Sequence, residues 1–172
     1  MEALESLVID VPDYPSQGVV FKDLTPLFND GAAFSRVVDA MVEPYRRGAA
    51  IDRVVGIEAR GFILGAPMAV ALGAGFVPLR KPRKLPRPTL SVAYALEYGT
   101  DELHVHVDAI AAGERVLVVD DVLATGGTAT AAIDLVRTAG AEVVGLAVLM
   151  EIPALQGRRR LGGVDVHALL TA

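Results

Sequence analysis

The chain has 172 residues, of which 52% are hydrophobic and 22% are charged, as is typical of one soluble globular domain with a full core. A net charge of −5 argues against binding to nucleic acid or to an anionic membrane, and the lack of cysteine excludes disulfides and thiolate chemistry. The N-terminus resembles no signal peptide, and no apolar run approaches the roughly 20 residues of a membrane span. We therefore expect a cytoplasmic protein.

Helices and buried strands alternate along most of the chain. Apolar residues at helical spacing predict helices over 34–45, 61–72 and 128–139, the last two ending at Gly73 and Gly140. Short apolar runs predict strands over 54–57, 76–79, 115–119, 143–150 and 164–170. Continuously apolar strands that alternate with helices are typical of a parallel sheet covered on both faces, so the expected fold class is α/β.

Two segments between these elements differ in character. Residues 80–88 are basic and rich in proline, which excludes a helix or a central strand. Residues 91–98 and 103–107 alternate loosely, which predicts a hairpin that turns across Gly99-Thr100-Asp101.

The most informative stretch follows the strand over 115–119. Asp120 and Asp121 stand where this strand is expected to end, and ligands of parallel sheets bind beyond such ends. The next residues, 124–128, read Ala-Thr-Gly-Gly-Thr and open a helix, whose free amides and dipole form a cradle for phosphate. A phosphate site beside two carboxylates, without the Gly-Lys-[Ser/Thr] ending of a P-loop, predicts a sugar phosphate as ligand.

The stretch "VVDDVLATGGT" resembles the phosphoribosyl-pyrophosphate (PRPP) signature of type I phosphoribosyltransferases. Four further segments resemble the adenine phosphoribosyltransferase family, in the same order: "PDYPSQGVVFKDLTPLF", "GIEARGFILGAP", "RKPRKLP" and "LEYGTDELHVHVDAI". The resemblance covers about Asp10 to Met150. It implies a central parallel sheet flanked by helices, in a single domain over 1–172, with a base-binding segment over 1–30 and a flexible β-hairpin hood over about 88–108.

The implied reaction is transfer of the phosphoribosyl group from PRPP to adenine, giving AMP and pyrophosphate. By resemblance, Asp120 and Asp121 hold the ribose hydroxyls. The 5′-phosphate would lie against Ala124, Thr125, Gly126, Gly127 and Thr128. The pyrophosphate would contact Glu58, Ala59, Arg60, Arg80, Lys81 and Lys84, the last three often across a dimer interface.

The same resemblance places adenine on Val20, Phe21 and Lys22. Many family members carry Arg where Lys22 stands, a change that is mild if backbone groups read the base. Glu97 matches the general acid/base toward the purine, and Tyr98 would help to close the site against water.

The resemblance also implies Mg²⁺ as cofactor, held mainly by the substrate and without a dedicated protein ligand, and a homodimer as assembly. We do not expect nucleic-acid or membrane partners. His104 and His106 are more simply a polar strand face than a metal pair, and residues 158–160 a solvated helix end.

Other functions remain open at this point. A xanthine-type relative would use the same PRPP site with another base pocket, and a PRPP- or purine-sensing protein could reuse the fold without catalysis. Taken alone, Glu58 and Arg60 read as a surface ion pair, Phe21 as ordinary core and the basic stretch as a solvated loop.

Overall fold

The protein is described by a computed structural model that covers residues 2–48, 50–95 and 100–172. Its helices are α1 (Glu2–Glu5), α2 (Thr25–Asn29), α3 (Gly31–Val42), α4 (Arg60–Leu72) and α5 (Gly127–Thr138), with 3₁₀ turns η1 (Glu43–Tyr45), η2 (Pro153–Leu155) and η3 (Gly157–Arg160). Its strands are β1 (Ile9–Pro12), β2 (Val20–Asp23), β3 (Arg53–Ile57), β4 (Gly75–Leu79), β5 (Thr89–Ala95), β6 (Thr100–His106), β7 (Arg115–Leu123), β8 (Glu142–Glu151) and β9 (Val166–Thr171).

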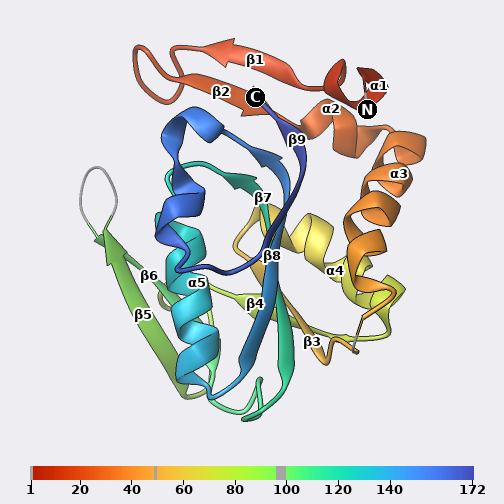
Figure 1. The fold of residues 1–172 in the computed structure, drawn as a ribbon. Coiled ribbons are helices and arrows are strands. Elements are labelled where there is room, and N and C mark those ends of the chain that lie inside the picture. Colours follow the sequence, from red (N-terminus) through yellow and green to blue (C-terminus); the bar gives the residue numbers. More distant parts are fainter. Residues whose placement is uncertain (1, 49, 96–99) are drawn as a thin grey trace.

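Five strands form a parallel sheet in the order β4-β3-β7-β8-β9, which confirms the predicted fold class. Figure 1 shows α3 and α4 on one face of this sheet, and α5 with the β5–β6 hairpin on the other. Each face buries its own apolar cluster, because the side chains of a strand alternate between the two faces. Nowhere in the described ranges is a helix both long and apolar enough to cross a bilayer.

The chain leaves β3 through α4 toward β4, and leaves β7 through α5 toward β8, in opposite directions along the sheet. β3 and β7 are direct neighbours, with Gly56 paired to Val119. The gap between their carboxyl ends is therefore the topological switch point, where open α/β sheets bind ligands.

Local sequence explains where the helices begin and end. Asp30 caps α3 by accepting hydrogen bonds from the amides of Ala32 (3.0 Å) and Ala33 (2.9 Å). Gly73 ends α4 with a φ of +66°, a left-handed conformation that glycine adopts without strain.

Two predictions about strand ends were wrong. β7 does not end at Val119 but continues through both acids to Leu123, because it keeps pairing with β8 as far as Glu151. The hairpin is present, but Thr100 and Asp101 belong to β6, where they pair with Ala95 and Tyr94, instead of forming the turn. Gly99 lies outside the described residues.

The short elements β1, β2, α1 and α2 were not predicted. β1 and β2 form a separate two-stranded antiparallel sheet, in which Val11 is paired with Phe21. These strands are only four residues long and neither has a fully buried residue, so they lack the apolar run that reveals a buried strand. Figure 1 shows this sheet lying across the end of the main sheet where the chain terminates.

Candidate functional site

A cavity of about 410 Å³ opens at the switch point between β3 and β7. Four segments that are far apart in the sequence line it: Val19–Lys22, Ile57–Arg60, Asp120–Ala129, and the pair Ile152 and Leu155; Lys81 completes the wall. Fourteen residues from the sequence-predicted site are thus brought together: Val20, Phe21, Lys22, Glu58, Ala59, Arg60, Lys81, Asp120, Asp121, Ala124, Thr125, Gly126, Gly127 and Thr128.

Residues 124–128 form a tight loop that leads from β7 into α5. Gly126 has a φ of +81°, and the first hydrogen bond of the helix runs from the amide of Thr130 to the carbonyl of Gly126 at 2.9 Å. The amides of Gly127, Thr128 and Ala129 therefore precede the helical ladder, and the helix dipole adds partial positive charge to them. Such a loop binds a phosphate group well.

The two carboxylates stand next to this loop. Asp121 is 3% exposed, and its Oδ2 lies 2.7 Å from Nε of Arg60 in an ion pair that lacks hydrogen-bond alignment. Burial and the neighbouring Asp121 raise the pKa of Asp120 well above its usual value. Burial also raises the pKa of Asp121, an effect that Arg60 opposes. A ligand that supplies positive charge or hydroxyl donors would therefore stabilise the ionised forms of these two carboxylates.

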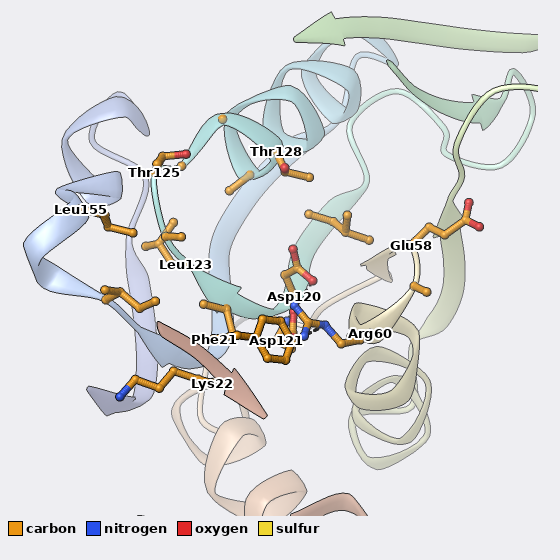
Figure 2. Close-up of a pocket in the computed structure, with 18 of the residues that line it drawn as sticks. Phe21, Lys22, Glu58, Arg60, Asp120, Asp121, Leu123, Thr125, Thr128 and Leu155 are labelled. Carbon is orange, nitrogen blue, oxygen red and sulfur yellow. Dashed lines mark hydrogen bonds and ion pairs between the residues drawn. The ribbon is translucent and has the colours of Figure 1, made fainter. Parts of the chain in front are cut away.

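Phe21 forms an aromatic wall of the cavity. The guanidinium of Arg60 lies 5.2 Å from the centre of its ring, and Tyr14 packs edge-on at 5.2 Å on the same ring. Figure 2 shows Phe21, Arg60 and Asp121 gathered at one side of the pocket, while the amino end of Lys22 points away. That ammonium pairs with Asp10 at 2.7 Å, so only the backbone of Lys22 is placed to meet a base.

The expected pyrophosphate residues divide into two groups. Ala59 and Arg60 begin α4 at the cavity, whereas Arg80 and Lys84 do not line it. Glu58 accepts hydrogen bonds from Nε of Arg80 at 3.1 Å and from the amide of Lys81 at 2.6 Å. Although partial burial opposes them, these bonds lower the pKa of Glu58. The simple alternative of a Glu58–Arg60 pair is wrong, because each residue has another partner.

Lys81 links the cavity to the hairpin. Its ammonium contacts the Tyr94 hydroxyl of β5 at 2.6 Å and the Asp101 carboxylate of β6. Burial opposes the change, but these two partners raise the pKa of Lys81, which stays a cation. Glu97 and Tyr98, the two candidate hood residues, lie outside the described residues.

Sequence reasoning missed the apolar wall formed by Ile152 and Leu155. Both follow the predicted strand over 143–150, in a segment without a resemblance, and the sequence signal was only two apolar residues that flank Pro153-Ala154. Residues 158–160 are exposed at the end of η3, as predicted for a solvated helix end, but the sequence did not reveal the ion pair of Arg158. Its guanidinium donates to both carboxylate oxygens of Glu151, at 3.0 and 2.5 Å.

The histidines show no metal site. His104 contacts Glu102 at 2.9 Å and Thr89 at 3.1 Å, as expected for a polar strand face. Among the described residues, no three or more His, Cys, Asp or Glu side chains gather in a way that could hold a metal ion. A cation in the cavity would need a ligand to supply most of its oxygens, and the carboxylates that line the cavity are those of Glu58, Asp120 and Asp121.

The similarity of this chain to known proteins extends over nearly its whole length. Residues 27–166 match the phosphoribosyl transferase domain. An adenine phosphoribosyltransferase of Acidothermus cellulolyticus is 59% identical over 98% of this chain and 95% of its own length.

Solved structures agree in fold and sequence. The adenine phosphoribosyltransferase of Thermoanaerobacter pseudethanolicus superposes with a TM-score of 0.95 at 45% identity, covering 99% of each chain. That of Saccharomyces cerevisiae, solved with adenine and an imino-altritol bisphosphate, has a TM-score of 0.94 at 39% identity, covering 98% of this chain and 97% of its own.

Proposed function

Since the chain belongs to the phosphoribosyl transferase family, we propose that it transfers the 5-phosphoribosyl group of PRPP to adenine, giving AMP and pyrophosphate in purine salvage. One observation carries the proposal: a phosphate-binding loop, two adjacent carboxylates and an aromatic wall line the same cavity. These features match, in order, the phosphate, the ribose and the base of AMP. Relatives at 54–59% identity that carry this activity in their names support the choice of adenine.

The 5′-phosphate end is assigned to residues 124–128. The amides at the start of α5 donate to phosphate oxygens, and the hydroxyls of Thr125 and Thr128 add further donors. The hydroxyl of Thr130 is not assigned to the phosphate, because it donates to the Gly126 carbonyl at 2.8 Å. PRPP and AMP share this phosphate, so the loop holds substrate and product alike.

The ribose is assigned to Asp120 and Asp121. The base nitrogen forms a bond to C1 of the ribose while pyrophosphate leaves with the bonding electrons. Positive charge develops on the sugar ring, and carboxylates held nearby stabilise it more in the transition state than in the substrate. Arg60 favours the ionised form of Asp121, since its guanidinium opposes the rise in pKa that burial causes.

The leaving pyrophosphate is assigned to the start of α4 and to Lys81. The amides at the α4 terminus and the Arg60 guanidinium provide donors, and the Lys81 ammonium provides a second cation. Arg80 and Lys84 contribute charge from outside the cavity wall, and Arg80 orients Glu58. Mg²⁺ held mainly by the substrate would neutralise charge on the leaving pyrophosphate, and the carboxylates of Glu58, Asp120 and Asp121 line the cavity that would receive it.

The base is assigned to the β2 segment. Adenine stacks on Phe21, and the backbone groups of Val20 and Lys22 read its edge. In the described part of the chain, β2 pairs on one side with β1 in a two-stranded sheet, which leaves its other edge to a ligand. We assign proton transfer at the purine to Glu97, and closure of the site to Tyr98, on the resemblance alone.

We also propose that a second copy of the chain packs on α4. Ile63 and Val70 are seven residues apart, hence on one face of this helix, and they are 41% and 84% exposed. Val70→Glu should convert a dimer to a monomer in sedimentation velocity, whereas Arg47→Glu, at a side chain that is 88% exposed, should not. A wild-type chain that sediments as a monomer would refute this assembly.

The experiment that tests the function is pyrophosphate release from PRPP and Mg²⁺ with adenine, hypoxanthine, guanine or xanthine supplied separately. Turnover with adenine alone, with AMP as product, supports the proposal. Turnover with xanthine would favour the xanthine-type alternative and refute the base pocket at Phe21. PRPP binding without turnover on any base would favour a sensing protein.

A further inference from the structure

The segment that follows β8 packs against the phosphate loop. The amide of Ile152 donates to the Leu123 carbonyl at 2.9 Å, which holds the start of the segment beside the end of β7. Figure 2 shows Leu155 on the same side of the pocket as Leu123 and Thr125. The segment is thus a second layer behind the loop that receives the 5′-phosphate.

At Gly157 this contact is between two backbones. A Cβ atom added to Gly157 would lie 2.2 Å from the carbonyl oxygen of Ala124 and 2.9 Å from the amide nitrogen of Gly126. In return, a Cβ on Gly126 would lie 2.5 Å from the carbonyl oxygen of Gly157. Any side chain at either position must therefore push the two segments apart, and the parts that move are backbone atoms of the phosphate loop.

An ion pair fixes the position of Gly157. Arg158, the next residue, donates two hydrogen bonds to Glu151 at the end of β8 and a third, at 2.8 Å, to the Val166 carbonyl of β9. Glu151 is 9% exposed, and the hydrogen bonds from Arg158 lower its pKa, so the pair is ionised. A forked guanidinium bound at three points leaves η3 little freedom relative to the sheet.

We propose that Gly157 and the Glu151–Arg158 pair are positioning residues that set the shape of the 5′-phosphate loop and thereby the affinity for phosphorylated ribose. This inference rests on the proposed function, because it assigns the 5′-phosphate to residues 124–128. It predicts a selective effect. PRPP and AMP carry the 5′-phosphate, whereas adenine and pyrophosphate do not.

Gly157→Ala is the direct test, with Gly31→Ala as the matched control. Gly157 has no positive φ, so alanine can adopt its backbone conformation and the substitution tests only the steric overlap of the added Cβ. A Cβ on Gly31, by contrast, meets nothing within 4 Å. Steady-state kinetics in both directions should show KM for PRPP and for AMP raised by about tenfold or more, since a shift near 1 Å in a positioning group costs up to about 100-fold. KM for adenine and for pyrophosphate should change less than about twofold, and Gly31→Ala should match the wild type.

Equal changes in all four KM values, or a lower kcat with unchanged KM for PRPP and AMP, would overturn the proposal. A wild type that does not turn over adenine would instead refute the proposed function. If Gly157→Ala does not fold, the variants Arg158→Met and Arg158→Lys test the proposal instead. Arg158→Met should raise KM for PRPP and AMP together, and lysine, which keeps the charge but not the fork, should restore part of the loss. Equal KM values for both Arg158 variants and the wild type would also overturn the proposal.

Discussion

Gly61 offers a sharp test of how the fold places Asp120. It lies in the first turn of α4, and a Cβ at this position would come 2.7 Å from the carbonyl oxygen of Val119, 3.1 Å from Oδ1 of Asp120 and 3.3 Å from its Cα. The first distance is well below an ordinary carbon–oxygen contact, and the atoms concerned belong to β7. Gly61→Ala must therefore move the start of α4 or the backbone that carries Asp120.

The expected magnitude follows from this overlap. Overpacking of this kind lowers the free energy of unfolding by about 1–3 kcal/mol. Because we assign the ribose to Asp120, a displacement of its carboxylate by a fraction of an ångström should lower kcat/KM for PRPP by about 10- to 100-fold. Urea unfolding measures the first effect, and pyrophosphate release at varied PRPP measures the second.

Gly65→Ala is the control, because it lies one helical turn further along the same helix. A Cβ there meets Cε2 of Phe76, a side chain that does not line the cavity, at 2.9 Å, and the Cα of Gly56 at 3.4 Å, which is an ordinary contact distance. It should cost a similar free energy of unfolding, but kcat/KM should stay within about threefold of the wild type, as expected for a change that leaves the reacting groups in place. If the two variants lose activity equally, the close approach of α4 to β7 does not position Asp120.

Three further predictions concern single side chains. Phe21→Ala should raise KM for adenine by about 5- to 150-fold, the equivalent of the roughly 1–3 kcal/mol of base stacking, and leave KM for PRPP unchanged; an unchanged adenine KM contradicts the stacking role. Arg60→Met removes the cation that opposes the raised pKa of Asp121, so the acid limb of the kcat/KM profile for PRPP should move to higher pH, and an unmoved limb counts against this pairing. Arg158 lowers the pKa of Glu151 below the usual 4.5, so its contribution is present above that value and is lost as the pH falls through the folded-state pKa. Denaturant unfolding should show Glu151→Gln less stable than the wild type by about 1–3 kcal/mol at pH 7, with a gap that shrinks below pH 4.5; a gap independent of pH would show that the ion pair is not its source.

The parallel sheet and its main helices could be predicted because their signals are local. Continuous apolar runs such as Val116–Val119 mark buried strands, and glycines such as Gly73 mark helix ends. The loop over residues 124–128 was equally visible, since a Gly-Gly turn that enters a helix needs no tertiary context. The end of β7 was misplaced because polar Asp120 and Asp121 interrupt the apolar run, although pairing with β8 continues past them.

What the sequence did not reveal depends on contacts between distant segments. Nothing near Gly157 indicates that it touches Gly126, and nothing near Arg158 indicates its bond to Glu151. The partners of Glu58 and Arg60 were also missed, because residues two apart at the junction of β3 and α4 can face different neighbours. These side chains contact elements that become neighbours only when the sheet has folded, so the periodicity of the sequence does not predict such contacts.

A crystal structure of the chain with AMP would test the central claim most directly. We predict the 5′-phosphate of AMP on the loop over residues 124–128, its ribose hydroxyls on Asp120 and Asp121, and its purine ring against Phe21. A nucleotide bound in the reverse orientation, or outside this cavity, would contradict the assignment.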